Sequence, residues 1–186
     1  MTTLQSTELL RTAFREMMKS VFTTVPGHVV LFDPVLQRAQ VKVGVQTVSV
    51  NGVANDPPPI ADVPVLFFGG TQYSVIHQIN PGDEGLILFS QRCIDGWKQT
   101  GGVATNPLSR FHDMYDAFFI PGFRPLPTRI PNFINDGIRI QSRDGGHHVW
   151  IKSSGEIGIE NGAGHIKLLP DGTVRINDSV IPPPTP

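Results

Sequence analysis

Histidines with neighbouring acids are the first residues in this chain that could do chemistry. His147 and His148 stand together shortly after Asp144, and His112 is followed directly by Asp113. Such sets could bind a metal ion or transfer a proton. Adjacent residues of a strand point to opposite faces of a sheet, so one chain cannot turn both His147 and His148 to the same ion. A metal site would need symmetry to bring copies of one histidine together, and we expect His112 to be a hydrogen-bonded packing residue.

The other reactive residue types also lack a catalytic arrangement. Four carboxylates fall in segments that we predict to be loops, where solvated turn residues are common: Asp56, Asp62, Asp83 and Glu84. Cys93 is the only cysteine, which excludes an intramolecular disulfide, and we expect it to be a half-buried packing residue. The glycines of Gly162-Ala163-Gly164 predict a turn and not a nucleotide site. We therefore expect no catalytic residue, no metal, no cofactor and no enzymatic activity.

Composition indicates a turn-rich domain of ordinary size. The chain has 186 residues, of which 39% are hydrophobic and 17% are charged, enough for one core and an appendage. Its 19 glycines and 17 prolines indicate many tight turns. The net charge of −1 gives no basic field, so we expect no nucleic-acid partner. Because we find no long apolar run and no signal-peptide pattern, we expect synthesis in the cytoplasm.

One amphipathic helix is predicted at the N-terminus, over residues 4–20. Ser6 is a candidate N-cap. Six apolar residues recur at helical spacing: Leu9, Leu10, Ala13, Phe14, Met17 and Met18. Two interpretations remain open: the helix covers an apolar surface of its own chain, or it packs on a partner subunit.

Short strands are predicted next, over residues 28–33, 40–50, 65–68, 73–79 and 86–90. A Pro-rich loop over 51–64 interrupts them, and a strong turn over 80–85 joins the last two. Strands of this number and length favour a small closed or sandwich-like β-domain, and an OB-like barrel fits best in size. Residues 91–136 are rich in proline, and we expect most of this stretch to connect the barrel to the C-terminal part of the chain.

The C-terminal part is a ladder of short apolar pairs separated by glycine-bearing turns. The first members of the pairs lie 11, 8, 9 and 8 residues apart. In four pairs an arginine, a lysine or a glycine separates the two apolar residues, and in the remaining pair Trp150 does; this alternation is typical of strands. The paired residues are Ile138 and Ile140, Val149 and Ile151, Ile157 and Ile159, Ile166 and Leu168, and Val174 and Ile176.

Each pair offers too narrow an apolar face to form a core alone. Three chains wound together would enclose the ten paired residues in a common lumen and remove the open sheet edges. The alternative is a single-chain solenoid or a meander folded onto the barrel. Solenoid rungs run to about twenty residues or more, so the short step favours the intertwined trimer.

In this order, a series of motifs resembles the central spike proteins of contractile phage tails. The motifs are Pro26–Val30, Ala61–Val65, Asn80–Phe89, Arg92–Trp97, Arg110–Asp113 and Ala117–Gly122, all before the β-repeat. The resemblance implies a mainly β chain with an N-terminal amphipathic helix, an OB-fold-like barrel and a short intertwined trimeric β-helix. The expected bounds are 1–24 for the helix, 25–95 for the barrel, 96–136 for the connecting segment, 137–181 for the triple-stranded β-helix and 182–186 for a Pro-rich tail.

The function implied by this resemblance is mechanical. A homotrimer in the virion baseplate would dock under the tail hub protein and puncture the host outer membrane when the sheath contracts. Some relatives end in a His-x-His motif that binds iron, but here no histidine follows His165, so no metal is carried over. A short needle would leave room for a separate tip protein at its C-terminal end. The alternative is a trimeric OB-fold module that binds an oligosaccharide or nucleic acid.

Overall fold

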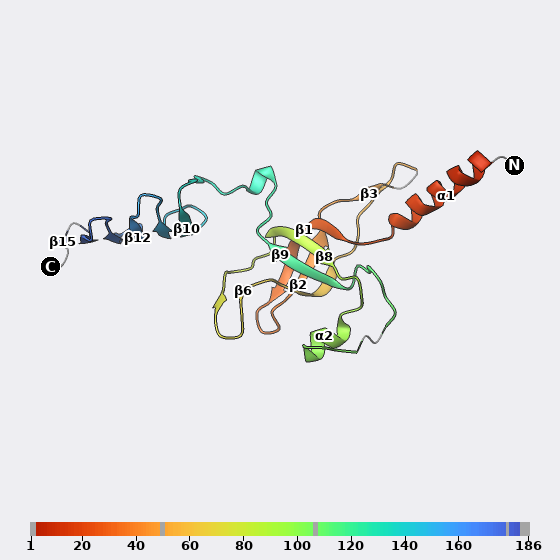
Figure 1. Cartoon of the computed structure of the whole chain (residues 1–186), viewed down its shortest axis with the longest axis horizontal. Coiled ribbons are helices and arrows are strands. Elements are labelled where there is room, and N and C mark those ends of the chain that lie inside the picture. Colours follow the sequence, from red (N-terminus) through yellow and green to blue (C-terminus); the bar gives the residue numbers. More distant parts are fainter. Residues whose placement is uncertain (1–2, 49–50, 106–107, 178, 183–186) are drawn as a thin grey trace. The chain divides into compact units, whose positions relative to one another are not determined.

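The computed structural model describes residues 3–48, 51–105, 108–177 and 179–182. They form two compact units, Met1–Pro127 and Thr128–Pro186 (Figure 1). The predicted mainly β fold is confirmed: an N-terminal helix precedes a curled, OB-like half-barrel, and an antiparallel sheet forms the C-terminal unit. Of the expected Pro-rich tail, residues 183–186 lie outside the described residues.

The N-terminal helix, α1, spans Thr3–Met18, close to the predicted range. Ser6 lies inside the helix, so the predicted N-cap is wrong: the helix begins before this residue. The helix ends where the Ser20 hydroxyl and backbone N–H both turn back to the Met17 carbonyl oxygen, at 2.7 and 3.1 Å. Phe22 then ties the chain to the barrel unit, because its N–H donates to the His112 carbonyl oxygen at 3.1 Å.

Five antiparallel strands make the half-barrel, in the order β5-β2-β1-β8-β9. Their bounds are β1 Thr24–Asp33, β2 Arg38–Val43, β5 Ile60–Pro64, β8 Glu84–Phe89 and β9 Ala117–Pro121. The sheet curls until its two edges meet: Val65, just after β5, bridges to Phe119 in β9, and the Leu66 N–H donates to the Phe119 carbonyl oxygen at 2.9 Å.

The core of the half-barrel comes from strict alternation along its strands. In β8 every second residue is buried, which places Gly85, Ile87 and Phe89 inside. Ile87 and Phe89 join a single cluster with Val29, Ala39, Val41, Ile60, Val63, Ile79, Ala117 and Phe119. Gly85 must be glycine, because a Cβ there would overlap both the Phe119 ring and the Ile120 carbonyl oxygen.

Two of these strands come from stretches that were expected to be loops. Ile60–Pro64 lies in the Pro-rich loop expected over 51–64, and its terminal proline is tolerated because β5 is an edge strand. Ala117–Pro121 lies in the connecting segment expected over 96–136. The half-barrel therefore extends beyond residue 95, since β9 pairs with β8 along its whole length.

Smaller elements surround the half-barrel. Two short hairpins are formed by β3 Thr47–Val48 with β4 Ala54–Asn55, and by β6 Phe68–Gly69 with β7 Ser74–Val75. They replace the longer strands expected over 65–68 and 73–79 and the end of the strand expected over 40–50. A short helix, α2, spans Asp95–Thr100, and a 3₁₀ turn, η1, spans Leu126–Thr128.

The C-terminal unit is a meander in which each strand pairs with its neighbours in sequence. Its strands are β10 Ile138–Gln141, β11 His148–Ile151, β12 Ile157–Asn161, β13 Gly164–Leu168, β14 Val174–Ile176 and β15 Ser179–Ile181. The five predicted strands are confirmed, and β15 is an additional one. Gly155 and Gly172 adopt positive φ (88° and 86°) in the predicted turns, a conformation in which glycine has no steric penalty.

Phe119 should carry a large share of the stability of the half-barrel. It is fully buried and lies where the two sheet edges meet, so Phe119→Ala should lower the free energy of unfolding by about 3–5 kcal/mol. Phe123→Ala is the matched control, because that ring is 56% exposed. Thermal unfolding followed by circular dichroism compares the two, and equal losses would contradict this account of the core.

Candidate functional site

The largest feature that needs a functional explanation is the face of the C-terminal sheet. The register pairs Ile140 with Val149, Val149 with Ile159, and Ile159 with Ile166. Because side chains alternate along strands, all ten residues predicted for the lumen fall on this one face. We call it the apolar face; it also includes Ile181 in β15, which pairs with Val174.

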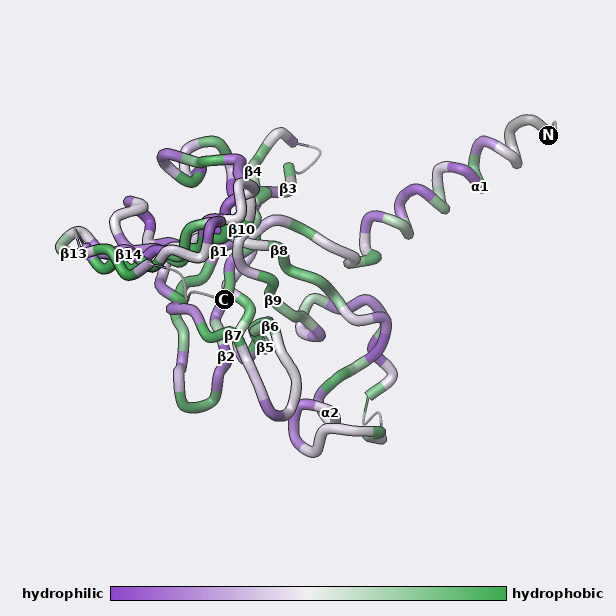
Figure 2. The backbone as a smooth tube through the Cα atoms, turned by 60° about the vertical axis from the view of Figure 1, so that its left-hand side comes forward, coloured by the Kyte–Doolittle hydropathy of each residue, from purple (hydrophilic) through white to green (hydrophobic). Residues whose placement is uncertain are grey.

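Most of the apolar face is uncovered in the single chain. Nine of the ten predicted lumen residues are 39–68% exposed, and Val174 is half-buried. Figure 2 shows the resulting alternation of hydrophobic and hydrophilic residues along the C-terminal strands. Contiguous exposed apolar surface of this kind marks an interaction site.

The opposite face of the same sheet carries charged side chains around Trp150. Trp150 lies between Arg139 and Lys152, whose cationic groups stand 4.8 and 4.7 Å from its ring. Its indole N–H donates to the Asp136 carbonyl oxygen at 2.7 Å. Stacked cations keep their charge in water while their stems cover the ring. The sheet therefore has one face that is stable in water and one apolar face whose exposure to water is unfavourable.

The histidine candidates are spread over different places. The Nδ1 of His112 donates to the Phe22 carbonyl oxygen at 3.0 Å, as expected of a hydrogen-bonded packing residue. His148 lies on the polar face, with its Nδ1 2.9 Å from Arg139 and its Nε2 3.9 Å from Glu160. Asp144 accepts from the Ser142 hydroxyl at 2.5 Å and stays within its own turn.

The loop carboxylates also have local partners. Asp56 pairs with Lys42 at 2.7 Å, and Asp62 lies 3.2 Å from Lys98. Asp83 accepts from the Asn80 N–H at 2.7 Å, which closes the turn before β8. Asp56 and Asp83 lie outside the strands, as expected. The loop prediction is wrong for Asp62 and Glu84, because β5 forms within the Pro-rich stretch and β8 begins directly after Asp83. Gly162 likewise lies in a turn, and Gly164 begins β13 directly after it; the Asn161 side-chain oxygen accepts from the Gly164 N–H at 2.9 Å.

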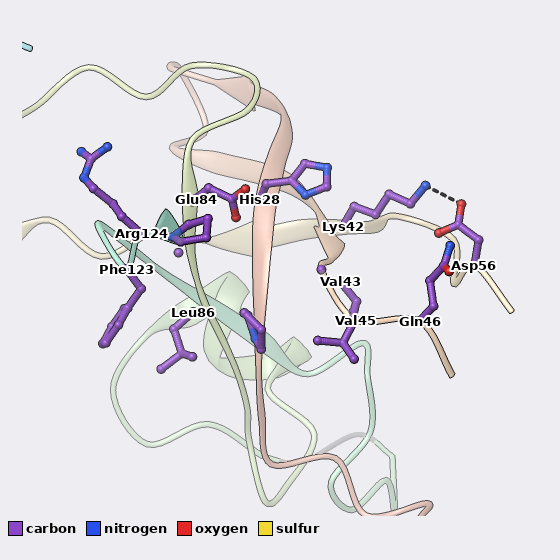
Figure 3. Close-up of a pocket in the computed structure, with 14 residues that line it drawn as sticks. His28, Lys42, Val43, Val45, Gln46, Asp56, Glu84, Leu86, Phe123 and Arg124 are labelled. Carbon is purple, nitrogen blue, oxygen red and sulfur yellow. Dashed lines mark hydrogen bonds and ion pairs between the residues drawn. The ribbon is translucent and has the colours of Figure 1, made fainter. Parts of the chain in front are cut away.

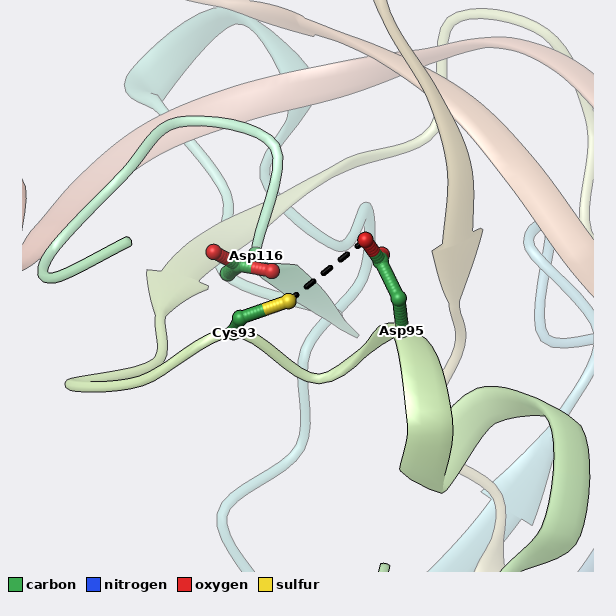
Figure 4. Close-up of side chains that lie close together, drawn as sticks. All are labelled: Cys93, Asp95 and Asp116. Atoms are coloured by element: carbon green, nitrogen blue, oxygen red, sulfur yellow. Dashed lines mark hydrogen bonds between the residues drawn. The ribbon is translucent and has the colours of Figure 1, made fainter. Parts of the chain in front are cut away.

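Sequence reasoning missed one cluster, formed by Cys93, Asp95 and Asp116 (Figure 4). Among the described residues it is the one set of three potential metal ligands from the side chains of cysteine, histidine and acids. Arg110 already fills it, however: one guanidinium nitrogen lies 2.8 Å from both carboxylates and 3.2 Å from the Cys93 sulfur. A metal ion would have to displace this cation, so we assign the cluster a structural role.

Electrostatics in this cluster follow from burial and pairing. Burial of Asp116 opposes its charge, but hydrogen bonds from Arg110 and from the Ile94 N–H outweigh it and hold the pKa of that carboxyl below its usual value. The hydrogen bond to Asp116 in turn raises the pKa of Arg110. The four residues fasten the segment before β9 to the segment after β8. Cys93, Asp95 and Arg110 belong to the motifs Arg92–Trp97 and Arg110–Asp113, but the sequence did not predict that they meet Asp116, because the contact joins segments on either side of the β8–β9 pairing.

A groove with a cavity volume of about 1010 Å³ lies on the outer side of the half-barrel (Figure 3). Its floor comes from β1, β2 and β8, and His28 of β1 lies opposite Glu84 of β8 in the strand register. Phe123 and Arg124 form part of one wall, and the Lys42–Asp56 ion pair belongs to another. Charges of both signs line it, unlike the basic, aromatic grooves that hold single-stranded nucleic acid.

Comparison with known families identifies a domain that coincides with the half-barrel. The fold and the sheet geometry define a small β-barrel protein with an appended antiparallel sheet. Residues 25–122 match the family described as the phage protein Gp138 N-terminal domain, and they enclose nearly all of the sheet from β1 to β9. The match covers more than half of the chain, so the chain belongs to this family and is a phage protein.

No curated protein matches the chain significantly. Among the described residues, no helix is both long and apolar enough to cross a bilayer.

The Arg110 cluster predicts a pH-dependent stability. Because the pKa of Asp116 lies below its unfolded value, its contribution is complete at neutral pH and is lost as the pH falls below about 4. Asp116→Asn should therefore cost about 1.5–3 kcal/mol at pH 7 and flatten the acid side of the stability profile. Asp56→Asn, which breaks an exposed ion pair, should cost less than about 1 kcal/mol. Thermal melts between pH 3 and 7 compare them, and identical profiles would contradict the assignment.

Proposed function

We propose that this chain is a structural, non-enzymatic spike at the centre of a contractile phage tail. Three copies turn their apolar faces toward a common axis and form a needle in the virion baseplate. The half-barrel docks under the tail hub protein, and contraction of the sheath drives the needle through the host outer membrane. The single observation that carries the proposal is the uncovered apolar face on a one-layer sheet that follows a Gp138-type domain.

The meander itself favours several chains over one. A single-chain solenoid needs a further layer to cover the apolar face, and the described strands of the C-terminal unit form a single sheet. Burying what is still exposed stabilises by roughly 1 kcal/mol per side chain, or about 10 kcal/mol per chain. That gain is comparable with the free-energy cost of the translational and rotational freedom lost on association, about 4–15 kcal/mol, so burial of the apolar face can stabilise the trimer.

The geometry also suits the transmission of axial force. If the strands lie across the axis, each strand advances the needle by about 4.8 Å, and six strands give roughly 25–30 Å. This length only equals the hydrocarbon core of a bilayer, about 30 Å. A separate tip protein on the C-terminal end, next to β15, would extend the reach.

A second candidate function rests on the groove of the half-barrel. A trimeric OB-fold module could hold an oligosaccharide there, against Phe123 and between polar side chains such as His28 and Glu84. The balance of charges in the groove disfavours nucleic acid. In this module the apolar face would serve only to join the three chains, and no role would follow for the length of the C-terminal sheet, so we place this function second.

Assembly should fail when the apolar face is charged. Ile159 lies at the centre of the face and is 55% exposed in the single chain. Ile159→Asp would place three carboxylates in the lumen at a cost of several kcal/mol each, and we expect the trimer to be lost. Arg175→Asp is the control, because Arg175 lies on the polar face opposite Lys167. Gel electrophoresis of unheated samples in detergent should show trimers for the wild type and the control only. Trimers of Ile159→Asp would refute the inward orientation.

The position in the particle can be tested directly. Cryo-electron microscopy of assembled tails should show threefold density at the centre of the baseplate that fits three copies of β10–β15. Particles in which the chain is absent, or present away from the tail axis, would contradict the spike function.

A further inference from the structure

The N-terminal helix has an unpartnered apolar surface that the needle does not explain. Leu9, Leu10, Phe14, Met17 and Met18 are 50–72% exposed in the single chain. At 100° per residue these side chains, with Ala13 between them, span about half of the helix circumference. Glu8, Arg15 and Lys19 fall on the other half. The interpretation that this helix covers an apolar surface of its own chain therefore has no support from the exposed fractions.

The width of the apolar half indicates how many neighbours the helix has. A strip about 100° wide is enough for a helix that packs against one surface. A surface of about 180° leaves apolar side chains exposed against one neighbour but is covered by two, as in a bundle of three helices. The exposed apolar area of the five side chains is roughly 600 Å², which approaches the 800 Å² that each partner contributes to a standard interface.

Charges at the two borders of this surface indicate how the helices are oriented. Arg11 stands at the border next to Met18, and Glu16 stands at the border next to Leu9. In a cyclic, parallel arrangement the first border of one helix faces the second border of the next, so opposite charges meet. In an antiparallel pair equivalent borders face each other, which would place arginine against arginine and glutamate against glutamate.

The base of the helix is fixed to the rest of its unit. Phe22 is held by the backbone bond to His112, by the contact of its carbonyl oxygen with the His112 ring, and by the ring of Phe89 at 5.3 Å. Three copies related by a threefold axis therefore present three helix bases at equivalent positions. Only three residues separate this anchor from the end of α1 at Met18.

We propose that α1 is a second trimerisation element: the α1 helices of three copies form a parallel bundle with Leu10, Phe14 and Met17 at its centre. The occupant of the apolar half of each helix is thus the same surface of two other copies of this chain. This inference rests on the proposed trimer. It adds an interface at the N-terminal end of the chain. The three copies would then associate both through α1, which precedes the half-barrel in the sequence, and through β10–β15, which follow it.

Site-specific cross-linking of the full chain tests this inference. Leu10→Cys places thiols at the centre of the bundle, where Cα atoms of neighbouring helices come within disulfide range. We expect oxidation to link two of the three chains, so that up to two thirds of the protein runs as a disulfide-bonded dimer on a denaturing gel. Arg15→Cys, on the polar half of the same helix, should cross-link at least tenfold less. Wild-type protein controls for Cys93, which is buried.

The outcomes separate this inference from the function on which it rests. A wild-type chain that is trimeric by native mass but whose Leu10→Cys variant cross-links no more than Arg15→Cys would overturn the bundle and leave the spike intact. In that case α1 would bind another protein of the tail. A wild-type chain that is monomeric would overturn both.

Discussion

The alternation of side chains in β10–β15 is the constraint on which the rest of this structure depends. A strand turns successive residues to opposite faces, and here the register keeps every isoleucine, valine and leucine of the ladder's pairs on one of them. The turns come so soon that the unit forms one layer, and a single layer cannot cover its own apolar face. The other face cannot exchange roles with it, because cations stacked on Trp150 and the contacts of Glu160 with His148 and Lys167 belong in water.

The half-barrel, unlike the C-terminal sheet, buries its apolar residues within one chain. Its curled sheet encloses a core of its own, and β9 closes the gap at Phe119. The ion-paired cluster of Arg110 and Asp116 holds the segment that delivers β9 to this position. The chain thus joins a domain that forms its own core to a sheet that leaves one apolar face uncovered, which is the arrangement that the proposed spike requires.

Sequence reasoning succeeded where a local period carries the signal. The strands of the C-terminal ladder follow from alternation and glycine turns, and the face that its apolar residues share follows from the same period. The helix could be predicted from its spacing, but Ser6 was wrong as its cap because the helix begins before it. The sequence did not predict two strands, β5 and β9, because prolines at their borders resemble loop signals while their pairing is decided by distant partners.

Of the candidate functional residues, the sequence likewise predicted only those that follow a local period. Residues such as Ile159 could be placed on the apolar face from the sequence, because alternation along short strands leaves a periodic pattern. The Arg110 cluster could not, since its members are separated by up to 23 residues and only the closed sheet brings them together.

In the proposed spike, other copies of the same chain cover the apolar face. Native mass spectrometry of the unmodified, full-length protein measures this most directly. We expect a single dominant species of three chains, each of 20.3 kDa, that persists on dilution to nanomolar concentration. A stable, soluble monomer at micromolar concentration would contradict it, because the exposed face would then need no partner.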